Sequence, residues 1–101
     1  MRKKKLVWYA GAENDLLRLK QWIARQAPRT AAAFIRRLRN EVNELRYWPY
    51  RGGLIGEDND YELRQIHVRD FRIIYHYDGT TVSVVKVVHG SKPLGPEDFQ
   101  E

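Results

Sequence analysis

Residues 70–90, "DFRIIYHYDGTTVSVVKVVHG", decide the fold because they have the pattern of one β-hairpin. Two runs rich in Val, Ile and Tyr flank the dipeptide Asp78-Gly79, which is a strong signal for a tight turn between antiparallel strands. The stretch therefore predicts strands over residues 71–77 and 82–89. It also places an arginine and two histidines inside a run that is otherwise typical of a buried core.

Side chains alternate between the two faces of a strand, so the pairing within the hairpin decides which residues share a face. One predicted face is mostly apolar and aromatic and carries Phe71, Ile73, Tyr75, Tyr77, Val82, Val84, Lys86 and Val88. The other predicted face carries Arg72, Ile74, His76, Val85, Val87 and His89. We expect helices to cover the first face and the second to stay open to a partner.

A third strand is predicted over residues 61–68, joined to the hairpin by a two-residue turn. Continued alternation places Arg64 toward the helices and both Gln65 and His67 on the open face. His67 then lies directly across from Arg72. A bulge or a longer turn would exchange the faces of this strand.

The first half of the chain has the pattern of a short strand followed by two helices. Residues 4–10 are largely apolar and aromatic and predict a strand. Apolar residues then recur at steps of three or four, over residues 12–27 and again over 31–45, as in amphipathic helices. Pro28 is tolerated in a first helical turn, so it marks the start of the second helix of an antiparallel hairpin.

The segment between the second helix and the meander is predicted to be a loop. Residues 49–60 contain three glycines and an acidic cluster, but no Gly-Lys-Ser/Thr sequence that would indicate a phosphate-binding loop. The whole pattern predicts a single α+β domain spanning residues 1–101. Its parts are an N-terminal strand, an antiparallel helix hairpin and a three-stranded antiparallel meander whose sheet packs on the helices.

The 101 residues carry a net charge of +5, and the positive charge is concentrated in the first half. Residues 1–46 hold twelve Lys and Arg against four Asp and Glu, whereas residues 47–101 hold six against nine. Such a surface favours nucleic acid or an acidic protein as a partner. Because the chain has no cysteine, disulfides, thiolate metal sites and cysteine nucleophiles are excluded.

Neither a membrane span nor a metal site is predicted. The apolar run near the N-terminus ends at Gly11 and is too short for a signal peptide or a transmembrane helix. We therefore expect the chain to act in the cytoplasm, away from membranes. Its three histidines lack the local spacing of a helical zinc pair, so no metal or other cofactor is expected.

The order of these elements resembles that of the RelE/ParE superfamily, the toxins of bacterial type II toxin-antitoxin modules. The segments that carry the resemblance are "AENDLLRLKQWI" (12–23), "PRTAAAFIRRL" (28–38), "YELRQIHVRDFRIIY" (61–75) and "VVKVVHGSK" (84–92). The resemblance implies an α+β domain encoded beside an antitoxin, which wraps the toxin with an extended or helical segment. It also implies growth inhibition, with roles in plasmid stabilisation and stress response.

Two activities occur in that superfamily, and the first is cleavage of mRNA on the ribosome by RelE-like members. Such cleavage needs a base for the 2′-hydroxyl, cations for the transition-state charge and an acid for the leaving oxygen. The resemblance then implies His67 as base or phosphate ligand, Arg72 as charge stabiliser, and His89 or Lys92 as acid or cation. These four residues form the predicted nuclease set.

ParE-like members instead poison DNA gyrase, which requires binding surfaces rather than a catalytic set. The chain has Gln65 and Phe99 where RelE-like members commonly carry a basic residue and a tyrosine, so the ParE-like activity is favoured. The residues expected to bind the antitoxin or the target are Arg36, Arg37, Arg39, Gln65, Arg72 and His89. A small basic RNA-binding module without toxicity is a third alternative, and ordinary structural roles compete for each of these residues.

Overall fold

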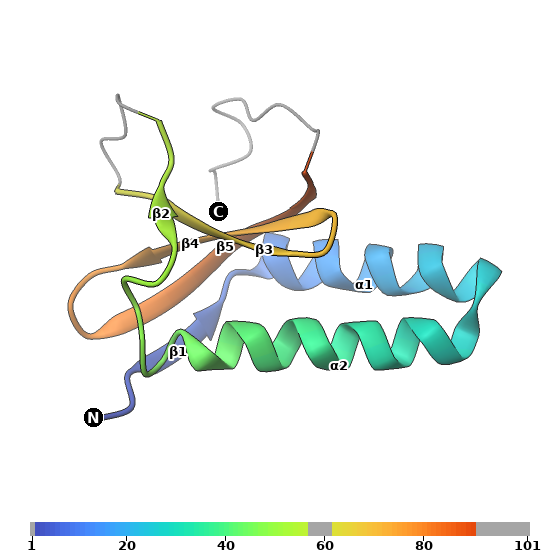
Figure 1. Ribbon diagram of the computed structural model, residues 1–101, viewed down its shortest axis with the longest axis horizontal. Helices are drawn as coiled ribbons and strands as arrows, with labels where there is room; N and C mark the ends of the chain where they lie inside the picture. Colours follow the sequence, from blue (N-terminus) through green and yellow to red (C-terminus); the bar gives the residue numbers. More distant parts are fainter. Residues whose placement is uncertain (1, 57–61, 91–101) are drawn as a thin grey trace.

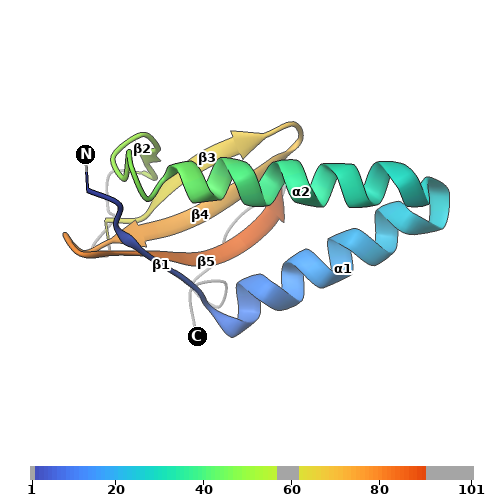
Figure 2. The same cartoon turned by 90° about the horizontal axis from the view of Figure 1, so that it is seen from below.

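A computed structural model describes residues 2–56 and 62–90. The elements in chain order are β1 (Lys5–Trp8), α1 (Ala10–Gln26), α2 (Pro28–Glu44), β2 (Gly53–Leu54), β3 (Arg64–Val68), β4 (Phe71–Tyr77) and β5 (Thr81–His89). The strands form one sheet in the order β1-β5-β4-β3-β2. Both helices lie on one face of this sheet (Figure 1, Figure 2). The predicted α+β architecture is confirmed, including the N-terminal strand, the helix hairpin and the meander.

Two features of the sheet go beyond the predicted meander. β1 pairs in parallel with β5, with Lys5 opposite Thr81, so the first strand joins the last one at the edge of the sheet. β2 occupies two residues of the segment predicted as a loop and pairs with β3 through Gly53 and Gln65. Both pairings are long-range, and the local sequence does not specify either of them.

The main core lies between the helices and the sheet, as the alternation predicts. Tyr75 and Val84 are fully buried there, together with Leu16 from α1 and Leu38 from α2. Burying one such aliphatic side chain contributes about 1.5–3 kcal/mol relative to leaving it in water. A smaller cluster around Ile74 forms on the opposite face of the sheet.

The hydroxyl of Tyr75 ties the segment after α2 to the centre of the sheet. It donates a hydrogen bond to the carbonyl of Pro49 and accepts one from the backbone N–H of Gly52, each at 2.8 Å. Burial raises the pKa of Tyr75 above its ordinary value, so the hydroxyl keeps its proton. A Cβ at residue 52 would lie 2.6 Å from this oxygen, so the site accepts only glycine without movement.

A β-bulge in β5 changes the faces predicted for the end of this strand. Tyr75 pairs with Val84 as the alternation predicts, but Ile74 pairs with Lys86. Val85 is therefore an extra residue between the two pairs. Because side chains alternate with a period of two, one extra residue exchanges the faces of everything that follows it.

The predicted faces of the last four residues of β5 are consequently wrong. Val87, predicted on the open face, belongs to the core beneath the helices. His89 pairs with Phe71 on the same helix-covered side. Lys86 and Val88, predicted beneath the helices, lie on the opposite face by the same register.

The carboxylate of Asp15 on α1 binds β5 directly after the bulge. Its Oδ2 accepts a hydrogen bond from the backbone N–H of Val87 at 3.0 Å, and its Oδ1 lies 3.3 Å from Lys86 Nζ. The side chains of this ion pair are 12% and 21% exposed, so solvent screens their attraction less than at an open surface. This contact fixes the first helix against the last strand.

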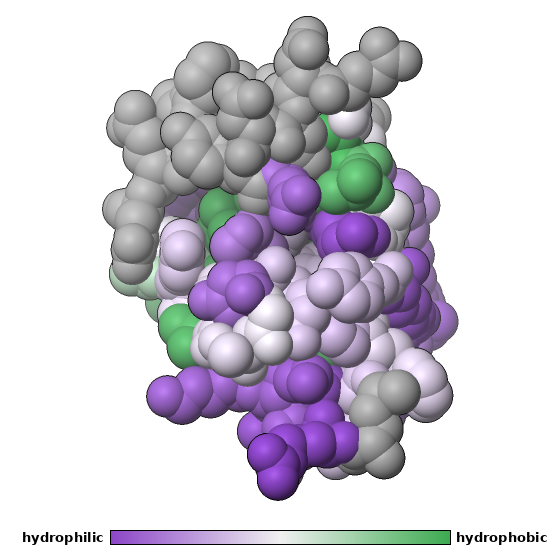
Figure 3. All heavy atoms as spheres, turned by 90° about the vertical axis from the view of Figure 1, so that its left-hand side faces the viewer, coloured by the Kyte–Doolittle hydropathy of each residue, from purple (hydrophilic) through white to green (hydrophobic). Residues whose placement is uncertain are grey.

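The N-terminus, the end of α2 and the β4–β5 turn share one end of the molecule (Figure 1). Lys4 donates its backbone N–H to the carbonyl of Arg46 at 2.8 Å, and Arg46 Nε donates to the carbonyl of Lys4 at 2.8 Å. Figure 3 looks onto this end, where pale residues of intermediate hydropathy lie among strongly hydrophilic ones. The helix-hairpin turn and the β3–β4 turn lie at the other end.

Replacing Tyr75 with phenylalanine tests the buried hydroxyl. Tyr75→Phe leaves the Gly52 N–H and the Pro49 carbonyl without their partner. We therefore expect the free energy of unfolding to fall by about 1–3 kcal/mol. Urea denaturation followed by circular dichroism measures this. Tyr77→Phe is the control, because the Tyr77 hydroxyl donates to the Gly79 carbonyl at an exposed position. Equal losses in the two variants would contradict the assigned role.

The Asp15 contact makes a separate prediction about the bulge. Asp15→Ala removes both bonds to β5 and is expected to cost about 1.5–3 kcal/mol of unfolding free energy, the range for hydrogen bonds to charged groups. Amide exchange of Val87 should accelerate at the same time, and Asp15→Asn should restore part of the protection. Asn14→Ala, an exposed neighbour on α1, is the control. Unchanged exchange at Val87 in Asp15→Ala would rule the contact out as a determinant of stability.

Candidate functional site

Three of the predicted site residues lie together on the sheet face away from the helices. His67 of β3 is directly opposite Arg72 of β4, as predicted. Arg72 Nη1 donates a hydrogen bond to Gln65 Oε1 at 3.2 Å. Gln65 and Arg72 are half-buried, whereas His67 is exposed. The arrangement provides a guanidinium and an imidazole side by side on adjacent strands.

His89 does not join this group. The bulge places it on the helix-covered side, where its ring lies edge-on to Phe71 with 5.5 Å between centroids. Lys92 lies outside the described residues. The three members of the predicted nuclease set that the structure describes are therefore divided between the two faces of the sheet.

The three arginines of α2 that were predicted to bind a partner, Arg36, Arg37 and Arg39, lie in different surroundings. Arg39 Nη2 lies 3.2 Å from Glu13 Oε2, and its guanidinium lies 5.1 Å from the centre of the Trp8 ring. Arg36 and Arg37 are both exposed, and Arg37 lines a cavity beside Phe34. The residues predicted to bind antitoxin or target thus do not form one continuous site.

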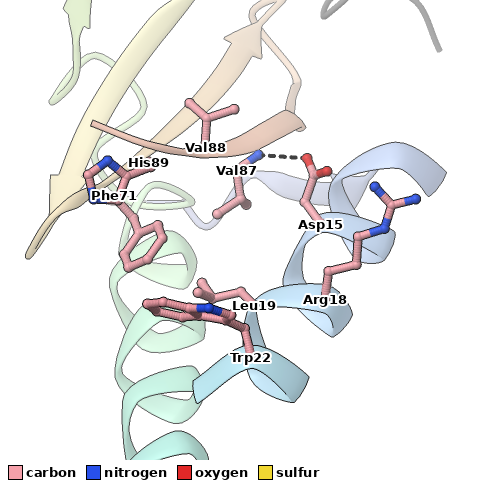
Figure 4. Close-up of a pocket in the computed structure, with 8 residues that line it drawn as sticks. All are labelled: Asp15, Arg18, Leu19, Trp22, Phe71, Val87, Val88 and His89. Atoms are coloured by element: carbon pink, nitrogen blue, oxygen red, sulfur yellow. Dashed lines mark hydrogen bonds between the residues drawn. The ribbon is translucent and has the colours of Figure 1, made fainter. Parts of the chain in front are cut away.

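A groove runs between the helix hairpin and the ends of β4 and β5. It consists of two cavities of about 310 and 330 Å³ that both include Phe71 in their walls, and we call it the Phe71 groove. In Figure 4 the Trp22 and Leu19 side chains on α1 face Phe71 and Val87 across the first cavity. The second cavity lies between Phe34 on α2 and the β3–β4 turn.

The Phe71 groove combines an apolar interior with a rim on which three arginines outnumber two carboxylates, Asp15 and Asp70. Trp22 lies at the edge of the groove, and 56% of its surface is exposed, which is a large aromatic area in contact with solvent. Arg18 borders the first cavity, and Arg37 and Arg69 border the second. Arg69 has its guanidinium 5.9 Å from the Phe34 ring centre and adopts a positive φ of 54° in the β3–β4 turn. An apolar partner segment flanked by carboxylates fits such a surface.

The prediction from sequence missed the part of α1 that forms this groove. One signal was present, because Arg18 and Trp22 are four residues apart and therefore neighbours on one helix face. The contribution of Asp15 had no such signal, since its partner Val87 is 72 residues away in the chain. His89 was included in the predicted set, but for the opposite face.

Neither helix in the described part of the chain has the length and hydrophobicity that crossing a membrane requires. Within residues 2–56 and 62–90, no three His, Cys, Asp or Glu side chains are grouped as metal ligands.

Solved structures share the fold of this chain. One belongs to the chromosomal ParDE toxin-antitoxin system from P. aeruginosa, with a TM-score of 0.74, 14% identity, and coverage of 86% of this chain and 96% of that one. Another belongs to the RelBE2 toxin-antitoxin complex from Mycobacterium tuberculosis, with a TM-score of 0.63, 22% identity, and coverage of 87% and 99%. At these identities the likeness supports the fold alone.

The comparison with family models assigns the chain. Residues 6–94 match the model described as the ParE toxin of the type II toxin-antitoxin system, parDE. No curated protein matches the chain. The family match spans most of the sequence, including both helices and every described strand except the first residue of β1, and it confirms the resemblance to the RelE/ParE superfamily. The chain therefore belongs to the ParE toxin family of type II toxin-antitoxin systems.

Proposed function

We propose that this toxin inhibits growth by poisoning DNA gyrase and that a cognate antitoxin neutralises it by direct binding. The bulge in β5 is the observation that carries the choice of target. It separates His89 from His67 and Arg72, so the described residues offer no convergent acid, base and cation for RNA cleavage. Gyrase poisoning requires binding surfaces only. The proposal places the toxin and both of its partners in the cytoplasm.

The Phe71 groove is the surface we assign to the antitoxin within this proposal. Its apolar interior accepts large side chains, and the rim formed by Arg18, Arg37 and Arg69 favours acidic residues beside them. Covering the groove would also remove the exposed part of Trp22 from water. An amphipathic acidic segment would satisfy both requirements, in agreement with an antitoxin that wraps the toxin.

The proposed target can be tested by expressing the chain from an inducible promoter. We expect growth arrest with filamentation and a DNA-damage response, and inhibition of supercoiling when the purified chain is added to gyrase. The double variant His67→Ala with His89→Ala should remain toxic, because gyrase poisoning requires no general acid or base from the toxin. Circular dichroism would establish that the variant is folded.

The opposite outcome would identify the other activity. Rapid loss of translation, with mRNA cut at fixed codon positions and abolished by the double substitution, would contradict gyrase poisoning. Growth arrest that co-expression of the neighbouring antitoxin gene fails to relieve would contradict neutralisation. The two halves of the proposal therefore fail separately.

The assignment of the groove is tested by antitoxin affinity. Trp22→Ala removes an exposed aromatic anchor and is expected to weaken antitoxin binding by about 2 kcal/mol or more, roughly 30-fold. Isothermal titration calorimetry with the antitoxin encoded beside the toxin measures the change. Trp48→Ala is a matched control, because Trp48 is similarly exposed, at 54%, but lies at the other end of the molecule. Equal affinities of the Trp22→Ala variant and the wild type would place the antitoxin elsewhere.

A second candidate is ribosome-dependent cleavage of mRNA. The direct opposition of His67 and Arg72, with Gln65 hydrogen-bonded beside them, is the observation that favours it. Under this alternative His67 acts as base or phosphate ligand and Arg72 stabilises charge, while His89 and Lys92 retain the roles that the resemblance implies. The partners would then be the ribosome and its mRNA, and the antitoxin would still neutralise the toxin.

A further inference from the structure

Exposed aromatic and basic residues lie at the end of the molecule opposite the Phe71 groove. Figure 3 shows this end, with pale residues of intermediate hydropathy among hydrophilic ones. We define the end patch as Trp48, Tyr50, Lys3, Lys5, Arg46 and Arg64. Trp48 is 54% exposed and Tyr50 is 66% exposed. Single exposed aromatic residues are ordinary on a protein surface. Two exposed aromatic residues within three positions, bordered by cations, form a surface that offers both stacking and positive charge.

The Tyr50 ring is held in place although most of it is exposed. Tyr77 meets it edge-on with 5.2 Å between ring centroids, and the guanidinium of Arg64 lies 5.0 Å from its centre. Arg64 is fixed in turn, because its Nη1 donates to the carbonyl of Gly52 at 2.7 Å. A ring ordered in this way loses little side-chain entropy when a flat ligand stacks on it.

Trp48 lies in a turn that is similarly constrained. The backbone N–H of Trp48 donates to the carbonyl of Glu44, and the backbone carbonyl of Trp48 accepts from the backbone N–H of Arg51, each at 3.1 Å. The following residue, Pro49, is buried, and its carbonyl accepts a hydrogen bond from the hydroxyl of Tyr75. The indole is therefore presented to solvent from a backbone tied to the core.

The basic N-terminal run is tied to Arg46, just after the end of α2. The two backbone-directed hydrogen bonds between Lys4 and Arg46 place Lys3 and Lys5 next to the end of α2. Both lysines are exposed and Arg46 is half-buried. Arg46 precedes Trp48 by two residues, so these cations and the indole lie at the same end of the molecule.

Two carboxylates at this end are already occupied by groups of the protein. Glu41 Oε2 lies 2.9 Å from Arg51 Nη2. Asp78 accepts hydrogen bonds from the backbone N–H groups of Thr80 and Thr81, and these lower the pKa of its carboxyl. Glu44, at the end of α2, is exposed as well, so the four cations of the end patch outnumber this exposed carboxylate.

We propose that the end patch binds single-stranded nucleic acid. Bases stack on Trp48 and Tyr50, and the phosphates between them lie against the lysines. A single strand is required because its bases expose their faces, whereas a duplex buries them in its own stack. This binding uses a surface separate from the Phe71 groove, and the proposal does not rest on which target the toxin has.

The test is a fluorescence-anisotropy titration of the purified full chain with labelled oligonucleotides of about ten nucleotides, a length within the usual range of such sites. One DNA and one RNA strand of the same sequence distinguish the two sources of the ligand. Because stacking contributes about 1–3 kcal/mol per base, Trp48→Ala should weaken binding about 5- to 150-fold. Trp48→Phe should retain most of the affinity. Trp22 is similarly exposed but lies outside the end patch, so Trp22→Ala should leave the oligonucleotide affinity unchanged.

A salt titration separates phosphate contacts from stacking. For single strands the slope of log affinity against log salt changes by about 0.7 for each phosphate contact. Lys3→Ala should therefore reduce the slope by about that amount. Trp48→Ala should lower the affinity and leave the slope unchanged. Arg36→Ala, an exposed cation on α2 outside the end patch, should alter neither quantity.

Three results would overturn the proposal. In the first, Trp22→Ala and Trp48→Ala weaken binding equally. In the second, a duplex competes as well as a single strand and Trp48→Ala has no effect, which indicates diffuse electrostatic attraction. In the third, no oligonucleotide binds but Trp48→Ala weakens binding to gyrase, which identifies a protein-binding surface. Growth arrest in the toxicity assay would stand unchanged in each case, so the proposed function is tested separately.

Discussion

The extra residue at Val85 is the constraint on which the functional surfaces of this toxin depend. Without it, the alternation of β5 would carry His89 to the same face as Arg72 and would leave Val88 under the helices. With it, Val87 enters the main core and His89 borders the Phe71 groove. Asp15 holds this arrangement by accepting the backbone N–H of Val87, so the bulge and the first helix fix each other.

The elements with a local signal could be predicted from the sequence. The two helical stripes, Pro28 at the start of α2 and the Asp78-Gly79 turn all matched the structure, as did the pairing of His67 with Arg72. The bulge lacked such a signal, because "VSVVKVV" has uniform strand character on both sides of it. The strand after the bulge is hydrogen-bonded to a carboxylate on a distant helix, and no periodicity within the strand reports that contact. For the same reason the Phe71 groove escaped prediction, since it requires knowledge of how α1 is rotated over β5.

Charge alone does not distinguish the two ends of the molecule. Arginines border the Phe71 groove, and lysines and arginines border the end patch, but the surfaces between them differ. The groove is concave and lined by Phe71, Phe34 and Leu19, so it suits side chains that insert. The end patch presents the exposed rings of Trp48 and Tyr50, so it suits ligands that stack. Similar net charge therefore corresponds to different partners.

The separation of these surfaces constrains how neutralisation works under our proposals. An antitoxin seated in the Phe71 groove leaves the end patch uncovered unless its chain extends along the sheet or α2. Nucleic acid could then remain bound to the neutralised toxin, and each ligand would alter the affinity of the other only through a coupling that acts equally in both directions. Neutralisation by occupancy requires that gyrase contact the groove or a surface beside it. The end patch would then add affinity for a target that carries nucleic acid, while the groove determines whether the target is reached at all.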